Sequence, residues 1–184
     1  TTSRRSSVLC GRLESTRRSG SHSRSLQSTF EFLILEGAQA GLSWITILKK
    51  REDYRIAFDQ FDPEIFATYG KRKKQSLLSN AGLVRHRLKI ESAIQNAKAF
   101  LVVQEEFGTF EKYIWGLVGG KPKQNAWKSM EAVPAQIPES DAMSKELKQR
   151  DFKFVGSTIC YAFMQAVGMV NDHMVDCFRH AELK

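Results

Sequence analysis

A carboxylate and an indole, Glu36 and Trp44, stand eight residues apart in a stretch of mostly small residues. An apolar run over residues 30–35 leads into this stretch, so Glu36 is a lone acid among apolar neighbours. In such a setting a charge must be used or neutralised. An indole offers its π face to a cation, and a carboxylate accepts hydrogen bonds. The pair therefore suits a flat, positively charged ring as its ligand.

Two interpretations of this pair remain open from the residues alone. One continuous helix would place Glu36 and Trp44 roughly on the same side, because eight residues span just over two helical turns. Most glutamates, however, point to solvent, and most tryptophans pack in the core. By composition alone, the commoner arrangement is a solvent-exposed Glu36 at a helix junction and a Trp44 packed in the core. A ligand site formed by the two residues is the more specific interpretation.

The elements that must position these residues are predicted to be helices. Ser43 is the expected N-cap of a helix from Trp44 to about residue 58, and Asp62 that of a short helix to about residue 69. Apolar spacing and glycine stops predict further helices over residues 85–107, 109–118, 140–150 and 156–171. Residues 121–138, which hold three of the four prolines, form a connector. Because no pair of alternating strands stands out, the predicted fold class is all-α.

The charge of the chain is unevenly distributed. The sequence has a net charge of +8 and is 42% hydrophobic, which is ordinary for a globular protein. Residues 1–29 hold six arginines and one glutamate, a net charge of +5, so only +3 remains for the other 155 residues. Those first 29 residues have almost no apolar periodicity, and we expect a disordered tail or a loose cover. The division predicted is a basic segment over 1–29 and a helical domain over 30–184.

Cysteine usage and hydropathy indicate the compartment. No stretch approaches the about 20 apolar residues that a membrane span requires. The Arg- and Ser-rich first residues lack the apolar segment of a secretory signal, and three cysteines do not make a disulfide framework. We therefore expect a cytoplasmic protein whose cysteines are thiols or metal ligands.

Four blocks of the sequence resemble the 3-methyladenine DNA glycosylase I family. They are residues 36–44 (Glu-Gly-Ala-Gln-Ala-Gly-Leu-Ser-Trp), 80–90 (Asn-Ala-Gly-Leu-Val-Arg-His-Arg-Leu-Lys-Ile), 153–161 (Lys-Phe-Val-Gly-Ser-Thr-Ile-Cys-Tyr) and 170–177 (Val-Asn-Asp-His-Met-Val-Asp-Cys). The likeness covers about residues 30–178, in the order of the family. Four blocks in register are a stronger signal than any single motif.

The resemblance implies an all-α helix-hairpin-helix DNA glycosylase that flips 3-methyladenine out of alkylated double-stranded DNA and hydrolyses its N-glycosidic bond. It assigns Glu36 as the catalytic, base-reading acid and Trp44 as the group that stacks on the base. Methylation makes this base cationic and a good leaving group, so little general-acid help is needed. We expect a monomer with no membrane partner.

The segment around Lys153 looks like the hairpin of helix-hairpin-helix proteins. There, a turn before a helix directs backbone N–H groups to a phosphate. By resemblance, Gly156, Ser157 and Thr158 form that turn, and Lys153 contacts the DNA. A helix start preceded by a glycine is the alternative interpretation, because such openings are common caps. The basic residues 71–74 and 85–87 are candidates for the DNA face, although a charge run is more often a solvated surface.

Asn171 stands where the wider superfamily carries a catalytic aspartate. An asparagine cannot act as a carboxylate, so no general base is expected there. Asp172 is the nearest alternative acid, and we do not assign it that role.

The family also implies a structural zinc. His173 and Cys177 are four residues apart, so on a helix they would share a face and reach one metal. The other two ligands lie near the N-terminus in the family, where this chain offers Cys10 and His22. The family's N-terminal motifs with aromatic residues are missing here, and residues 2–29 contain no Phe, Trp or Tyr. A free thiol and an exposed histidine are therefore equally open interpretations of Cys10 and His22.

This departure leaves three functional hypotheses. The favoured one is a glycosylase, whose activity the altered N-terminus could impair. The second is an inactive helix-hairpin-helix module that binds DNA. The third is a helical interaction protein whose basic tail contacts acidic partners.

Overall fold

The computed structural model describes the backbone of residues 22–183 and the side chains from residue 28 onward. Its helical elements are α2 (His22–Gln39), α3 (Trp44–Ala57), η1 (Asp59–Phe61), α4 (Pro63–Ala67), α5 (Lys71–Ser79), α6 (Arg87–Phe107), α7 (Phe110–Gly116), η2 (Met130–Ala132), α8 (Pro138–Gln149), α9 (Ser157–Ala166) and α10 (Phe178–Glu182). Two short strands, β1 (Lys123–Gln124) and β2 (Val170–Asn171), pair in parallel. The predicted all-α class is confirmed, with this two-residue ladder as a small addition.

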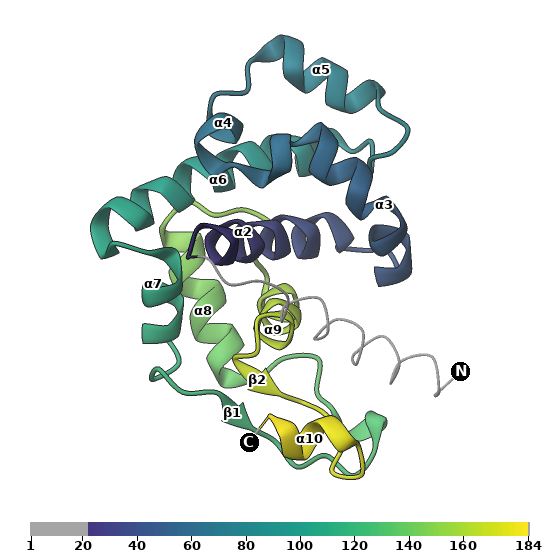
Figure 1. Ribbon diagram of the computed structural model, residues 1–184, viewed down its shortest axis with the longest axis vertical. Helices are drawn as coiled ribbons and strands as arrows, with labels where there is room; N and C mark the ends of the chain where they lie inside the picture. The colour runs from purple at the N-terminus through teal and green to yellow at the C-terminus, as the bar shows by residue number, and fades with distance from the viewer. Residues whose placement is uncertain (1–21, 184) are drawn as a thin grey trace.

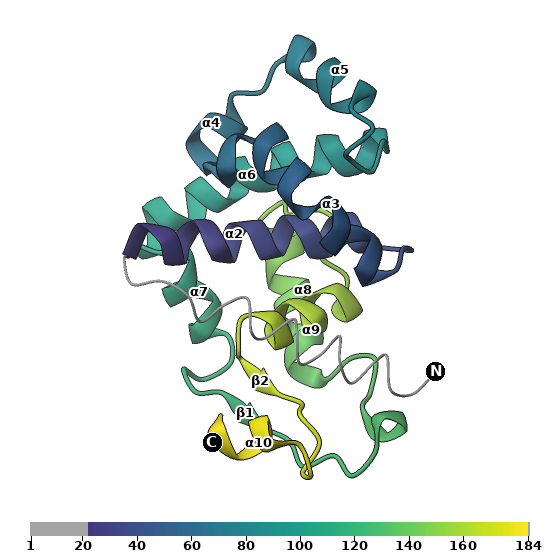
Figure 2. The same cartoon turned by 45° about the vertical axis from the view of Figure 1, so that its right-hand side comes forward.

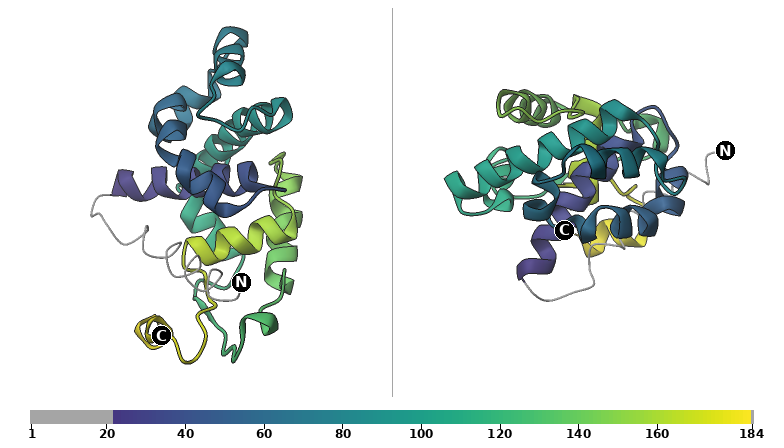
Figure 3. Two further views of the ribbon diagram at one scale, coloured as in Figure 1. Left: turned by 90° about the vertical axis from the view of Figure 1, so that its right-hand side faces the viewer. Right: turned by 90° about the horizontal axis from the view of Figure 1, so that it is seen from above.

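Helix α2 runs through the middle of the molecule (Figure 1). Helices α3 to α6 lie on one side of it, and α7 to α10 with the strands lie on the other. The turned views in Figure 2 and Figure 3 agree that α5 and α10 occupy opposite ends. None of the helices in the described part of the chain is long and apolar enough to cross a lipid bilayer.

The core surrounds α2. Every residue from 29 to 38 is buried, which is the pattern of a helix covered on all sides. Helices α3, α6, α7 and α9 pack against it. Two of the ten buried residues, Glu31 and Glu36, are acidic. A buried carboxylate needs partners that balance its charge. The burial of Glu31 and Glu36 in the central helix therefore requires a structural or functional explanation.

The predicted caps are confirmed by their hydrogen bonds. The Ser43 hydroxyl accepts from the backbone N–H of Thr46 at 3.3 Å. The Asp62 carboxylate accepts from Glu64 at 3.0 Å and from Ile65 at 3.3 Å. The Thr109 hydroxyl, at the start of the helix predicted over residues 109–118, accepts from Lys112 at 3.1 Å and caps α7. Local sequence chemistry therefore determines where these three helices begin.

Several predicted boundaries were wrong. Helix α2 already begins at His22, so residues 22–29 are helical and the expected tail does not include them. Helix α8 begins at Pro138, because Ser140 bonds back to the Ile137 backbone from the third helical position. Helix α9 ends at Ala166, and residues 170–171 form β2 where the sequence predicted helix. Residues 1–21 lie outside the described residues, and the proposed division of the chain there stays a prediction.

A left-handed turn follows α3. Asp59, Gln60 and Phe61 have φ angles of 48°, 58° and 57°, which L-residues rarely adopt. Tyr69 donates a hydrogen bond to the Asp59 carboxylate, and the Lys73 ammonium lies 2.9 Å from it. The Tyr69 hydrogen bond holds the pKa of Asp59 below its usual value; burial opposes this and Lys73 adds to it. These contacts offset the backbone strain of the turn.

Candidate active site

The acid and the indole lie on either side of a helix break. Helix α2 ends at Gln39, and Gly41 takes the left-handed φ of 76° that turns the chain before Ser43 caps α3. The single continuous helix considered above is therefore wrong. Glu36 occupies the last turn of α2, and Trp44 is the first residue of α3. Since α2 and α3 pack against each other, the turn brings the two residues to the same end of a helical pair.

Both side chains face the interior. Glu36 is 0% exposed and Trp44 is 6% exposed. This excludes the interpretation of Glu36 as a solvent-facing acid. A ligand could therefore reach Glu36 only if the groups that cover it moved, as is common for sites that must exclude water.

Lys89 of α6 holds the turn between α2 and α3. Its ammonium donates to the carbonyl oxygens of Ala38, at 2.9 Å, and Ala40, at 2.5 Å. A cation at the C-terminal end of a helix satisfies orphaned carbonyls and complements the helix dipole. Burial lowers the pKa of Lys89. In the sequence, Lys89 belongs to one of the four family blocks, but no role was predicted for it. In the structure, Lys89 fixes the end of α2.

Helices α8 and α9, with residues 150–156 between them, form the predicted hairpin. The carboxamide of Asn96, from α6, accepts from the Lys153 N–H at 2.7 Å and donates to the Lys153 carbonyl at 2.9 Å. The Ser144 hydroxyl donates to the Val155 carbonyl at 2.7 Å. Asp151 and Phe154 have positive φ angles of 69° and 54°. The hairpin is thus a tight turn anchored to α6 and α8.

The predicted DNA contacts lie on this hairpin. Gly156 precedes α9 without a side-chain cap, so the first N–H groups of α9 remain for an external acceptor. Thr158 is exposed, and Gly156 and Ser157 are partly exposed. The Lys153 ammonium pairs with Asp151 at 2.6 Å, but side-chain exposures of 52% and 67% make this a weak pair that a phosphate can displace.

His173 and Cys177 lie together but not on a helix. Residues 172–177 form a loop and turn, so the helical spacing argument was wrong. Even so, the Cys177 sulfur lies 3.5 Å from Nδ1 of His173. Burial is the main cause that lowers the pKa of His173, which favours the neutral imidazole. Nitrogen and thiolate sulfur are zinc donors, and this pair fits half of a tetrahedral site.

The other predicted ligands are not brought to this pair by the structure. Cys10 lies outside the described residues, and of His22 only the backbone, at the start of α2, is described. No group of three or more potential metal-ligating side chains gathers among residues 28–183. Cys160 is buried in the core, which raises the pKa of its thiol to about 12.

The two residues near the superfamily's catalytic position serve the fold. The Asn171 amide donates to Gln124 at 2.8 Å and to the His180 carbonyl at 3.2 Å. Asp172 is 1% exposed, and its carboxylate accepts three hydrogen bonds within 2.7 Å. The donors are the side chains of Asn125, Trp127 and Gln165. Neither residue has an atom available to activate water.

Comparison with known proteins gives a consistent result. The family model described as methyladenine glycosylase matches residues 19–180. The chain is 49% identical over 148 residues to DNA-3-methyladenine glycosylase 1 of Escherichia coli, which covers 80% of this chain and 79% of that protein. It is 48% identical over 151 residues to DNA-3-methyladenine glycosylase of Haemophilus influenzae, with 82% of each protein covered.

Solved structures share the fold. A crystal structure of 3-methyladenine DNA glycosylase I superposes with a TM-score of 0.79 at 50% identity, over 83% of this chain and 84% of that one. The enzyme from Staphylococcus aureus gives a TM-score of 0.80 at 35% identity, over 83% and 81%. A variant solved in complex with 3-methyladenine gives 0.81 at 35% identity, over 83% and 82%. A single family therefore accounts for the sequence similarity and the fold, and the chain belongs to the methyladenine glycosylase family.

Proposed function

We propose that this chain excises 3-methyladenine from alkylated DNA as a base-excision repair glycosylase, with Glu36 and Trp44 as the residues that hold the flipped base. The observation that carries the assignment of these residues is the fully buried carboxylate of Glu36, in the last turn of α2, at the junction with the helix that Trp44 begins. The family membership of the chain and the 3-methyladenine complex of a relative support the choice of base.

Glu36 and Trp44 recognise the charge and the shape of the base. A carboxylate accepts a hydrogen bond from the exocyclic amine and attracts the positive ring, a charge-assisted contact about twice as strong as a neutral one. The indole of Trp44 stacks on the ring face, where a cation adds an electrostatic attraction. A neutral adenine gains neither charge term, so the pocket discriminates against undamaged bases.

The chemical step is hydrolysis of the bond between the sugar C1′ and N9 of the base. The bonding electron pair moves to N9 and neutralises the cationic ring, so 3-methyladenine leaves without prior protonation. The oxygen of a water molecule bonds to C1′, and the proton of that water passes to solvent. Because the leaving group is already activated, this reaction requires no carboxylate at Asn171.

The hairpin holds the DNA while the base is flipped. The N–H groups at the start of α9, beside Gly156, bind a backbone phosphate, and Lys153 adds a cation. Such contacts set the register of the duplex without reading its sequence. Binding should weaken steeply as salt concentration rises.

His173 and Cys177 are proposed as half of a structural zinc site, with Cys10 and His22 as the candidates for the other half. A zinc ion there would tie the N-terminal segment to the loop after β2 and would take no part in the reaction. Metal analysis of the purified full chain should give one zinc per chain, and Cys177→Ser should lose it. A full equivalent of zinc in Cys10→Ser would contradict Cys10 as a ligand.

The direct test is release of free 3-methyladenine from methylated duplex DNA. The native chain should release it, and Glu36→Gln should lower kcat/KM at least about tenfold, which corresponds to about 1.4 kcal/mol. Glu105→Gln, at an exposed position of α6, is the matched control and should leave kcat/KM unchanged. Duplex binding without release by the native chain would instead favour the inactive helix-hairpin-helix module.

A further inference from the structure

Helix α6 contacts both parts of the proposed site, at two points seven residues apart. The Lys89 ammonium donates to the carbonyl oxygens of Ala38 and Ala40, where α2 ends. The Asn96 carboxamide holds both backbone groups of Lys153 in the hairpin. Residues seven positions apart lie on nearly the same face of a helix, about 10.5 Å apart along its axis. One face of α6 therefore joins the end of α2 to the hairpin.

A direct contact between α2 and the hairpin completes this arrangement. Gly37, which follows Glu36 in the last turn of α2, faces Phe154 of the hairpin. A β-carbon at Gly37 would lie 3.5 Å from the β-carbon of Phe154 and 3.6 Å from its carbonyl oxygen. Helix α2 also packs against α9, which follows the hairpin. Because α2, α6 and the hairpin contact one another in pairs, they fix the distance from Glu36 to the hairpin.

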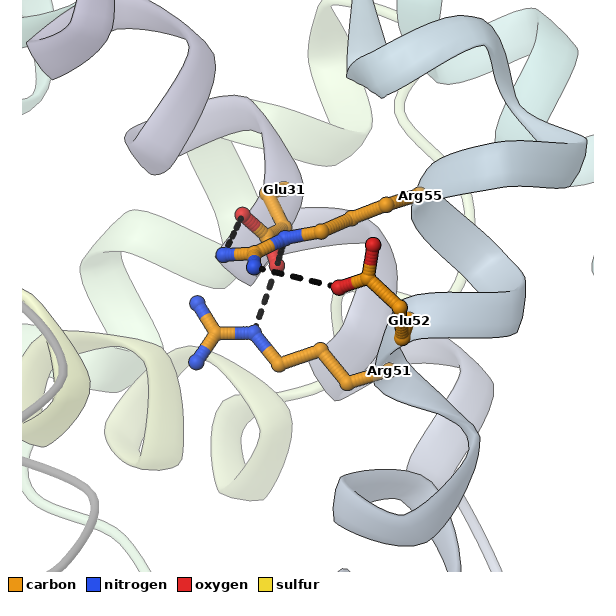
Figure 4. Close-up of polar contacts among 4 residues, drawn as sticks. All are labelled: Glu31, Arg51, Glu52 and Arg55. Atoms are coloured by element: carbon orange, nitrogen blue, oxygen red, sulfur yellow. Dashed lines mark hydrogen bonds and ion pairs between the residues drawn. The ribbon is translucent and has the colours of Figure 1, made fainter.

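A buried ion-pair cluster joins α2 to α3 independently of α6. Glu31 is 5% exposed, and its carboxylate accepts from Nε of Arg51 at 2.6 Å and from Arg55 at 3.0 and 3.1 Å. Figure 4 shows both arginines reaching from α3 to this carboxylate. Glu52, which is largely exposed, adds a longer contact of 3.6 Å to Arg55. Loss of the Lys89 bonds would therefore release the α2–α3 turn (residues 40–43) from α6 without separating α2 from α3.

The distance between the two parts matters because the base and the phosphates belong to one covalent strand. Once a phosphate is bound at the start of α9, the flipped base can reach only those positions that the sugar–phosphate backbone allows. A misplacement of about 1 Å can lower the rate of a reaction about a hundredfold, because the reacting groups leave their productive geometry. The end of α2 must therefore stand at one distance from the hairpin.

We propose that Lys89 is a positioning residue for excision: it fixes the α2–α3 turn at the distance from the hairpin that a flipped base requires. This inference rests on the proposed function of Glu36 and Trp44. Lys89 touches neither the base nor the DNA and acts through the turn between these two residues. An ammonium suits this role, because it has three donors and its charge complements the C-terminal end of α2.

The test compares excision from methylated duplex DNA with binding of free 3-methyladenine, both measured on the full chain. Lys89→Met keeps an unbranched side chain and removes both hydrogen bonds. With saturating protein in excess over DNA, the rate of base release should fall at least about tenfold. Affinities for the free base and for unmethylated duplex should stay within about threefold of the native values, because the pair and the hairpin are retained. Lys89→Arg keeps the charge and the donors, and its rate should return to within about threefold of the native rate.

Lys98→Met is the matched control, because it removes the same charge from an exposed position of the same helix. It should release the base at the native rate. A native rate in folded Lys89→Met would overturn the proposal even if this variant were less stable, since a purely structural contact lowers stability alone. Equal losses of rate and free-base affinity would contradict it as well, because Lys89 would then act on the pocket itself.

Two further outcomes are decisive. An unchanged rate with weaker duplex binding, and a salt dependence reduced by about one phosphate contact, would identify Lys89 as a DNA ligand and refute its positioning role. If Lys89→Met does not fold, Lys89→Gln keeps an N–H donor without the charge, and a native rate in that variant would refute the role too. Absence of base release by the native chain would instead refute the proposed function, so the two failures are distinguishable.

Discussion

Replacing Asn96 by alanine should loosen the hairpin and leave the base pocket intact. Asn96 is 3% exposed and reaches from α6 to both backbone groups of Lys153. A methyl side chain can make neither hydrogen bond. The Lys153 N–H and carbonyl would then need water or a rearranged turn. Glu36 and Trp44 lie on α2 and α3, so the substitution changes neither of these two side chains.

The size of the effect follows from the two bonds. Each hydrogen bond contributes a net of about 1 kcal/mol, which gives a lower bound of about 2 kcal/mol for the loss in free energy of unfolding. Leaving both backbone groups without partners would raise the loss to about 4 kcal/mol or more if they were sealed from water. The Lys153 side chain is about half exposed, so water can reach the turn, and we expect the lower part of this range.

Three measurements on the purified chain test this reasoning. Denaturant unfolding should show the loss of about 2–4 kcal/mol, and duplex affinity by fluorescence anisotropy should fall at least about tenfold, about 1.4 kcal/mol. Binding of free 3-methyladenine should be retained. The neighbouring Gln95→Ala is the control, since its bond to Asp151 is exposed and 3.2 Å long; it should change stability by less than about 0.5 kcal/mol. Equal duplex affinity in Asn96→Ala and the native chain would show that the hairpin does not depend on Asn96.

Four further substitutions test the backbone and electrostatic arguments. Gly37→Ala should stabilise the chain by about 0.5–1 kcal/mol in denaturant unfolding, because the added carbon would make only ordinary contacts in a helix. Gly41→Ala should destabilise the chain by about 1 kcal/mol, because a φ of 76° at this position strains an alanine. Gln60→Gly should raise the melting temperature, since relief of about 1–2 kcal/mol of left-handed strain exceeds the about 0.5–1 kcal/mol entropy loss of glycine. Asp59→Asn should be less stable than the native chain at pH 7. Tyr69 is the main cause that lowers the pKa of Asp59 in the folded chain. The Asp59 carboxylate therefore contributes stability above the unfolded pKa of about 3.9, and this stability is lost as pH falls through the folded pKa. The free energies of unfolding of the two chains should consequently converge in acid.

Local patterns in the sequence predicted most of the elements. Ser43, Asp62 and Thr109 each cap the expected helix, and Gly108 ends α6 with a φ of 83°. These features involve residues within four positions of each other, so the sequence contains the whole interaction. Boundaries failed where a neighbour in space decides them. Residues 170–171 join a strand because residues 123–124 lie beside them, which no local pattern could show.

The supporting residues of the site were missed for the same reason. Asn96 contacts Lys153 from 57 positions away, and Lys89 contacts Ala38 from 51. A helical asparagine or lysine has no local feature that distinguishes such a role from an exposed position. Glu31 lies within the run over residues 30–35 that the sequence analysis treated as apolar. Its partners, 20 and 24 positions along the chain, are visible only once α3 folds back on α2.

The two buried acids of α2 differ in their surroundings. Glu31 is held by two arginines, so its charge is balanced whether or not a ligand is present. Glu36 is fully buried at the junction with α3, where the proposed function places the cationic base. Under the proposed function, Asn171 and Asp172 take no part in excision, because the side chains of both are bonded within the fold.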